Sequence, residues 1–182
     1  MMMMMKMLLG CSSLCLLLLL SCLSEPAHSL PLRLSSCSVN VHTAELWKYH
    51  STIRSDVIAG DSEIAVKILD KSLIKDVQEG QMCCFVRLLM RFYVERVFGN
   101  YASSQPQHQR SSSALANSFI TIRKDIHKCH CHCAEDTQRK IDSVHAEFIK
   151  LQINEAAQKA MGELDVVLGW LDGLGQKTGD SS

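Results

Sequence analysis

The sequence predicts an all-α fold, a bundle of about six helices that disulfide bonds hold together. Apolar residues recur at intervals of three and four along most of the chain, which is the period of an amphipathic helix. The chain has three prolines, and the two beyond residue 29, Pro31 and Pro106, stand where the periodic patterns break. Six cysteines also lie beyond residue 29, and an even number is typical of a disulfide framework.

The first 29 residues have the features of a secretory signal peptide. Lys6 supplies a positive charge ahead of the uncharged residues 7–23, and Ala27 and Ser29 are small residues at the positions that signal peptidase reads. A retained membrane anchor is the alternative, but seventeen uncharged residues is the short limit for a span, and several are Ser, Gly or Cys. We therefore expect cleavage after Ser29, which leaves residues 30–182 as a single helical domain.

Three segments are predicted in the first half of that domain. Residues 43–60 carry apolar residues at helical spacing and end in Gly60. Residues 61–78 are ambiguous, because their apolar residues first alternate as in a strand and then recur every four positions. We expect an extended piece that runs into a short helix there. Residues 81–98 are the most apolar and confine their polar side chains to one narrow stripe, so other helices should surround this one.

Three further helices are predicted in the second half. After a polar loop at 102–110, apolar residues step by four and three as far as Cys129. The next helix begins near Ala134, where acidic residues follow in the first turn and favour the positive end of the helix dipole. The last helix is expected to start from Asn154 as its N-cap and to end at Gly173.

Charge and motifs exclude several classes of function. The chain has 19 basic and 19 acidic residues and no basic block, so nucleic acid and anionic membranes are not expected as partners. It contains no G-x-S-x-G, H-E-x-x-H, P-loop or G-x-G-x-x-G motif. We therefore expect neither an enzyme nor a bound cofactor. The chain also lacks an Asn-x-Ser/Thr sequon, so N-linked sugar is not expected.

The six cysteines that follow the predicted leader form an early and a late group. These are Cys37, Cys83 and Cys84, followed by Cys129, Cys131 and Cys133. A bond between neighbours within a group would close a strained ring, so each early cysteine is expected to pair with a late one. Six arrangements remain possible. Each bridge would close a loop of tens of residues, which on a chain-entropy estimate stabilises the fold by about 4 kcal/mol.

The Cys-His-Cys-His-Cys run at residues 129–133 also allows a second interpretation, a zinc site. Thiolate and imidazole are the usual zinc ligands. The spacing does not match the C-x2-C of closed zinc sites, however, and an oxidising compartment favours disulfides over metal binding. A disulfide framework is therefore the preferred interpretation of these cysteines.

A series of ordered motifs runs through residues 81–171. They are Cys83-Cys84 with Leu88-Leu89, Phe92 to Phe98 with Asn100-Tyr101, Ser112-Ser113, Leu115 to Phe119, Thr121-Ile122, Lys124-Asp125, Cys131 to Cys133, Lys159-Ala160, Gly162 to Asp165 and Trp170. In this order they resemble the interleukin-10 family of helical cytokines, and within it the subgroup of interleukins 19, 20 and 24. The resemblance implies a helical cytokine fold.

The resemblance also implies one set of disulfides. The bonds would join Cys37 to Cys129, Cys83 to Cys131 and Cys84 to Cys133, which is one of the six arrangements. The chain departs from the family pattern between the first two late cysteines, where relatives have several more residues. Residues 38–79 match the family weakly.

Family membership would imply a secreted, extracellular and largely monomeric signal. Such a protein binds two different type II cytokine receptor chains, and their pairing activates Janus kinases and STAT transcription factors. In this family the receptor faces involve the first helix, the loop that follows it and later helices. The candidate receptor-binding residues are therefore Arg54, Asp56, Lys67 and Asp70. The ordinary alternative for each is a solvated surface charge with little energetic effect.

Two other classes of function serve as alternatives. A secreted, disulfide-bonded helical carrier of lipid would need a large apolar cavity, and the well-filled helical stripes argue against one. A zinc-binding protein or a redox enzyme that uses residues 129–133 would need free thiols, which a complete set of disulfides removes.

Overall fold

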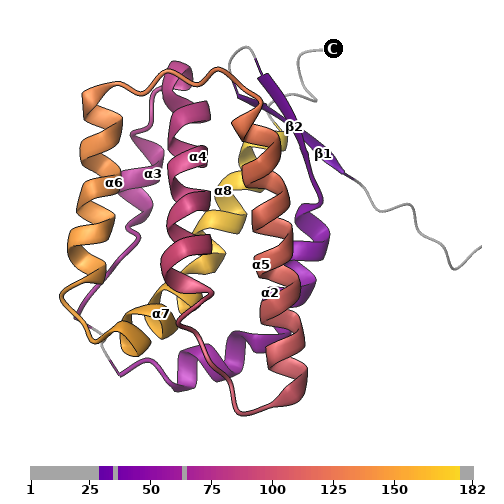
Figure 1. The fold of residues 1–182 in the computed structure, drawn as a ribbon, viewed down its shortest axis with the longest axis vertical. Helices are drawn as coiled ribbons and strands as arrows, with labels where there is room; N and C mark the ends of the chain where they lie inside the picture. Colours follow the sequence, from indigo (N-terminus) through magenta and orange to yellow (C-terminus); the bar gives the residue numbers. More distant parts are fainter. Residues whose placement is uncertain (1–28, 35–36, 63–64, 177–182) are drawn as a thin grey trace, which may run out of the picture.

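The computed structural model of the chain describes residues 29–34, 37–62 and 65–176 (Figure 1). In these residues a β-hairpin precedes seven α-helices. The elements are β1 (Leu30–Leu34), β2 (Cys37–Val41), α2 (Thr43–Ala59), α3 (Lys71–Lys75), the 3-10 turn η1 (Glu79–Gln81), α4 (Met82–Phe92), the π-helical turn η2 (Tyr93–Val97), α5 (Pro106–His127), α6 (Glu135–Phe148), α7 (Ile153–Gly162) and α8 (Leu164–Gln176). The predicted signal peptide lies outside the described residues apart from Ser29.

The helix α4 lies at the centre of the bundle, as the apolar character of residues 81–98 predicts. It packs against α5 on one side and α6 on the other, and α8 crosses behind it (Figure 1). Of its polar stripe, Arg87 is half-buried, and Arg91 and Glu95 are exposed and paired at 3.0 Å. The predicted position of this helix is confirmed. No helix in the described part of the chain is long and apolar enough to cross a membrane.

Aromatic rings fill the core where α4 runs into η2. The Phe92 ring contacts that of Phe148 on α6 edge to face at 5.3 Å, and the Tyr93 ring lies 5.4 Å from that of Phe119 on α5. Such contacts stabilise a core beyond the area that they bury. The buried Tyr93 hydroxyl donates a hydrogen bond of 2.9 Å to the Ala160 carbonyl on α7, so its polar atom is satisfied.

The β-hairpin is an element that the sequence analysis did not anticipate. Its strands pair antiparallel, with Leu30 opposite Val41 and Leu34 opposite Cys37. Residues 32, 34, 39 and 41 are apolar and buried, in the alternation of a strand with one face on the core. The first strand contacts α8 and the second contacts α5. The fold is thus a helical bundle with one small two-stranded sheet against its side.

The helix boundaries confirm several predictions and correct others. The first helix ends before Gly60, and a short helix, α3, follows, both as expected. The extended piece predicted before α3 is not observed in the described residues, which turn at Ala65 and bend at Ile68 and Leu69. The helix α5 starts at Pro106, inside the predicted loop, because proline suits the first turn of a helix. The N-cap of α7 is Gln152, so Asn154 as N-cap was wrong. The predicted last helix is two helices that break at Glu163, and the second continues past Gly173.

Three disulfides gather at the upper end of the bundle in Figure 1, where the α5–α6 connection passes the start of α4. They join Cys37 to Cys129, Cys83 to Cys131 and Cys84 to Cys133, with Cα–Cα distances of 5.8, 5.4 and 5.3 Å. These are the pairs that the family resemblance implies. The bonds link the hairpin and α4 to the connection between α5 and α6.

Candidate functional site

The four candidate residues lie on two neighbouring stretches of the chain. Arg54 and Asp56 are in the second half of α2, and Lys67 and Asp70 lie in the irregular segment 65–70 that leads into α3. Arg54, Lys67 and Asp70 are exposed, whereas Asp56 is partly buried. Their surroundings therefore distinguish charges that are available to a partner from charges that have internal contacts.

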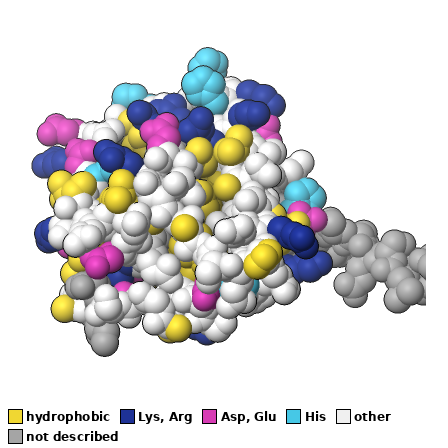
Figure 2. Space-filling view, turned by 60° about the horizontal axis from the view of Figure 1, so that its bottom comes forward, with side chains coloured by type: hydrophobic (Ala, Val, Ile, Leu, Met, Phe, Trp, Pro, Cys, Tyr) yellow, Lys and Arg dark blue, Asp and Glu magenta, His cyan; other side chains and the backbone are white. Residues whose placement is uncertain are grey.

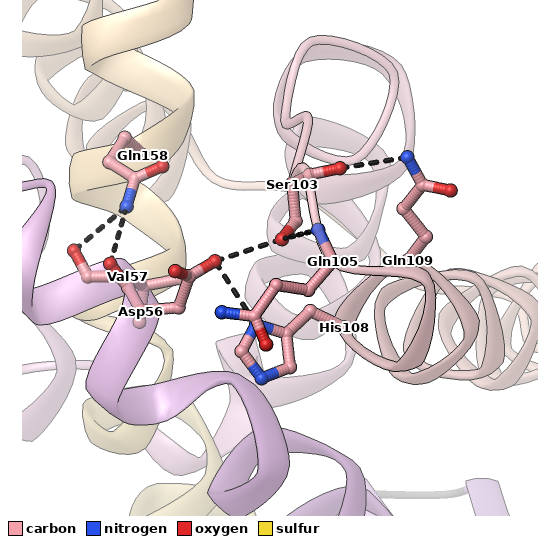
Figure 3. A network of polar contacts seen from close by, with 7 residues as sticks. All are labelled: Asp56, Val57, Ser103, Gln105, His108, Gln109 and Gln158. Atoms are coloured by element: carbon pink, nitrogen blue, oxygen red, sulfur yellow. Dashed lines mark hydrogen bonds and ion pairs between the residues drawn. The ribbon is translucent and has the colours of Figure 1, made fainter.

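Asp56 has contacts within the molecule (Figure 3). Its Oδ2 accepts a hydrogen bond of 2.9 Å from the Ser103 hydroxyl, and His108 Nδ1 lies 3.2 Å from the same oxygen. The Ser103 hydroxyl also accepts from the Gln105 amide at 3.2 Å. This network joins the end of α2 to the loop before α5 and to the first turns of α5.

The network changes the ionisation of its members. The Ser103 hydroxyl, and next the hydrogen bond with His108, hold the pKa of Asp56 below its usual value. Burial raises the pKa of Tyr101 to about 12, and the Asp56 carboxylate adds to this shift. Asp56 is therefore a carboxylate at neutral pH, and its charge strengthens the hydrogen bonds that join α2 to the start of α5.

The helix α7 fixes the last turn of α2 through Gln158. Its side-chain amide donates hydrogen bonds to the carbonyls of Asp56 at 3.2 Å and Val57 at 3.0 Å (Figure 3). These carbonyls belong to the last turn of the helix, where backbone acceptors outnumber donors, and the Asp56 carbonyl also accepts the Gly60 amide at 3.0 Å. The contact requires glycine at position 60, since a Cβ there would lie 2.6 Å from the amide nitrogen of Gln158.

The segment between α2 and α3 is anchored near both of its ends by residues of the α7–α8 region. Near its start, Lys159 Nζ lies 2.8 Å from Asp61 Oδ2, and this lysine side chain is only 7% exposed. Near its end, the Glu163 carboxylate accepts the amide of Leu69 at 2.7 Å and that of Ile68 at 3.1 Å. Burial raises the pKa of Glu163, while the Leu69 amide and the Lys159 charge oppose that shift.

Sequence reasoning missed both of these anchors. Lys159 and Glu163 stand four residues apart in a stretch that reads as one amphipathic helix, where a charged residue is ordinarily a solvated one. The break between α7 and α8 falls at Glu163, and it places the carboxylate beside the amides of Ile68 and Leu69. In the sequence, the one signal for this anchor is that Glu163 is an acidic residue between the apolar Met161 and Leu164.

Lys67 and Asp70 are close to each other on the anchored segment. The Asp70 carboxylate caps α3 and accepts the Ser72 amide at 3.1 Å. This hydrogen bond lowers the pKa of Asp70, and the Lys67 ammonium contributes to the same shift. No hydrogen bond or ion pair joins Arg54 to either residue in the described part of the chain. The structure thus brings Lys67 and Asp70 together and leaves Arg54 as a separate exposed charge on α2.

Exposed apolar side chains accompany these charges. Ile58 lies one turn after Arg54 on α2 and is 49% exposed, and Ile149 and Ile153 are exposed at the α6–α7 corner. These helix ends lie at the bottom of Figure 1, the part that turns forward in Figure 2. Figure 2 shows hydrophobic side chains in the middle of that face and charged side chains mainly toward its upper, left and right edges. An apolar centre with a polar rim is the usual anatomy of a protein interface.

The structure does not support a zinc site at residues 129–133, because the thiols that would bind the metal are in disulfides. The sulfurs of Cys129, Cys131 and Cys133 are each joined to another cysteine. Among the described residues, no group of three or more His, Cys, Asp or Glu side chains is placed to hold a metal ion. The cysteines are therefore structural.

Solved structures identify this arrangement of helices as a helical cytokine fold. The crystal structure of human interleukin-19 is similar with a TM-score of 0.67 and 29% identity, over 72% of this chain and 88% of that one. The structure of PROSS-edited human interleukin 24 is similar with a TM-score of 0.64 and 28% identity, over 81% of this chain and 97% of that one.

Sequence comparison identifies the family. A family model described as "Interleukin 10" matches residues 13–174. Mouse interleukin-20 is 38% identical over 78% of this chain and 83% of its own length, and human interleukin-19 is 32% identical over 76% and 81%. The chain therefore belongs to the interleukin-10 family. It is a cytokine and not an enzyme.

Proposed function

We propose that this cytokine is secreted after cleavage behind Ser29 and acts as a monomer that pairs two different type II cytokine receptor chains. Pairing would bring the receptors' Janus kinases together and activate STAT transcription factors. Membership of the interleukin-10 family supports the proposal. The strand β1, which starts at Leu30, directly after the proposed cleavage site, is also consistent with it.

The observation that carries the receptor proposal is an exposed charge on an anchored loop. Lys67 is exposed on a segment whose neighbouring amides, those of Ile68 and Leu69, are bound by Glu163. A loop that is already ordered loses less conformational entropy when it binds, so its contacts contribute more to affinity. Arg54 and Ile58 offer a second, helical contact on α2. The four candidate residues thus divide into Arg54 and Lys67 as direct contacts and Asp56 and Asp70 as residues that shape the surface.

The test is binding of the purified, disulfide-bonded protein to immobilised type II receptor ectodomains, singly and in pairs. A receptor pair should capture it more tightly than either chain alone. Lys67→Ala should weaken binding by about fivefold to thirtyfold, since a residue at the centre of an interface contributes about 1–2 kcal/mol. Arg139→Ala, which removes an exposed charge on α6, is the matched control and should change affinity less than twofold.

Glu163→Ala tests whether the anchor matters for binding. The variant leaves the Ile68 and Leu69 amides without their acceptor, which should cost about 1–3 kcal/mol of unfolding free energy. It should weaken receptor binding although Glu163 itself is only partly exposed. Absence of binding by the folded wild-type protein to any receptor chain or pair would refute the proposed function. Unchanged binding by Glu163→Ala would refute only the role of the anchor.

A further inference from the structure

A groove between α4 and α5 concentrates positive charge on a chain that is neutral overall. The groove has a volume of about 520 Å³ and is open to solvent. Its lining residues are Arg87, Leu88, Arg91, Glu95, Arg123, Lys124 and His127. Four of these side chains are cationic and one is anionic, against 19 basic and 19 acidic residues in the whole chain. Both walls carry cations, because the first four residues lie on α4 and its η2 extension and the last three on α5.

The single carboxylate organises the groove without neutralising it. Glu95 Oε2 lies 3.0 Å from Arg91 Nε, and Glu95 Oε1 lies 3.2 Å from Arg123 Nη1 across the groove. Each guanidinium has five N–H donors, so most of them stay available. The Arg91 side chain is 65% exposed and that of Arg123 is 37% exposed. Arg87 Nη2 donates to Cys133 Sγ at 3.1 Å, and sulfur is too weak an acceptor to compensate its charge.

We propose that this groove binds a sulfated polysaccharide of the cell surface or extracellular matrix. Arg87 and Arg91 are four residues apart on the α4 wall, about one helical turn of 5.4 Å, and Arg123 and Lys124 lie on the α5 wall. A polymer with a sulfate group on successive sugars can therefore meet several cations at once. Guanidinium groups suit sulfate for the same reason that they suit phosphate, because their fork can bind two oxygens.

The lining residues disfavour other anions. None of them is aromatic apart from His127, so the groove has no platform on which nucleic-acid bases could stack. Leu88 is its one apolar residue, whereas peptide grooves usually offer several apolar pockets. An open groove with cations on both walls fits a flexible and highly charged chain best.

The groove shares no lining residue with the α2 and 65–70 surface proposed for receptors. In Figure 1, α4 and α5 lie at the front of the bundle, and α3, which follows the anchored segment, is drawn behind α4 and α6. The cytokine could then be retained on a polysaccharide while its α2 and 65–70 surfaces stay accessible. This inference goes beyond the proposed function and depends on it only for the extracellular location.

The experiment is an isothermal titration calorimetry measurement. A heparin dodecasaccharide is titrated into the purified, disulfide-bonded protein in about 0.15 M salt. Arg123→Gln/Lys124→Gln removes two charges from the α5 wall and should weaken binding by about tenfold. Arg110→Gln/Arg139→Gln removes two exposed charges that do not line the groove and should change it less than twofold. Glu95→Gln should strengthen binding severalfold, so the test does not depend on a variant that loses function.

Three results would overturn the inference. The first is that the wild-type protein does not bind heparin. The second is that the groove variant and its control lose the same amount of heparin affinity, and the third is that polyglutamate binds as tightly as heparin. The last would indicate an acidic polypeptide instead. Fully desulfated heparin should bind at least tenfold more weakly than heparin. Receptor capture by the groove variant should be unchanged, and a wild-type protein that binds heparin but no receptor would refute the proposed function alone.

Discussion

The two ends of the bundle are held by different chemistry. At the upper end in Figure 1, three disulfides connect the hairpin and α4 to the α5–α6 connection. Toward the opposite end, the hydrogen bonds of Asp56 and Glu163 and the Lys159–Asp61 ion pair tie α2 and the 65–70 segment to α5, α7 and α8. A disulfide does not titrate, whereas hydrogen-bonded carboxylates do. The proposed receptor residues therefore lie at the end of the bundle where pH and single substitutions affect the structure most directly.

The largest effect should come from removal of a covalent link. Cys37→Ser/Cys129→Ser opens a bond that spans 92 residues, which on the chain-entropy estimate costs about 4 kcal/mol of unfolding free energy. Cys37→Ser alone should likewise lower stability and secretion. Urea denaturation of the purified protein measures the first effect, and the amount of protein in the medium measures the second.

Receptor binding should respond less than stability to the loss of this bond. The candidate residues Arg54 and Lys67 belong to α2 and the 65–70 segment, and Asp56 and Glu163 still hold these elements. The folded fraction of the double serine variant should therefore keep most of its affinity. An unchanged denaturation midpoint in that variant would mean that the Cys37–Cys129 bond does not stabilise the upper end.

A smaller effect should appear on mild acidification, through His50 on α2. Its side chain is completely buried, and burial lowers its pKa below the usual 6.5, although the Asp165 carboxylate opposes this shift. The unfolded chain therefore binds the proton at a higher pH than the folded chain. Stability should be full above pH 6.5 and should fall as the pH drops from 6.5 toward the lower pKa of the folded state.

The measurement is the difference in unfolding free energy between wild type and His50→Gln as a function of pH. Each unit by which the pKa is lowered is worth about 1.4 kcal/mol once the pH is below both values. His145, whose pKa is also lowered by burial, is present in both proteins and cancels. His127→Gln on the exposed surface serves as the control. A difference that stays constant from pH 7.5 to 5 would contradict a buried, neutral His50.

The smallest effect should come from one hydrogen bond of the polar network. Ser103→Ala removes the strongest cause of the low pKa of Asp56 and should cost about 1 kcal/mol of unfolding free energy at neutral pH. The adjacent exposed Ser104→Ala is the matched control. Because the pKa of folded Asp56 is below its unfolded value, its contribution is lost as the pH falls, so Ser103→Ala should lose less stability in acid than wild type. A steeper acid loss in the variant would contradict this role.

The sequence predicts most of the helices because each buries one regular stripe of apolar residues. The patterns of residues 43–60 and 81–98 place α2 and the α4–η2 helix within a few residues of their observed bounds, and the start predicted near Ala134 is one residue from that of α6. The same patterns fail where a local choice depends on a distant partner. A stretch that reads as one helix after Asn154 breaks at Glu163, whose carboxylate binds amides 94 and 95 residues away along the chain.

The candidate surface was predictable only in outline. Family resemblance indicates the first helix and the following loop, but residues 38–79 match that family weakly. From sequence, Asp56 and Arg54 are equivalent charges on one helix. In the structure Asp56 contacts Ser103 and His108, which lie about fifty residues later, whereas Arg54 is exposed.

By itself the sequence determined the helical class, the grouping of six cysteines and the absence of a catalytic motif, because these follow from local periodicity and composition. The tertiary structure alone decided which charges pair, where the last helix breaks, and that Arg91 and Arg123 share Glu95 across a groove. The physical reason is distance. Apolar periodicity acts between residues three or four apart, whereas a hydrogen bond or an ion pair forms only when the packed helices bring two distant side chains together.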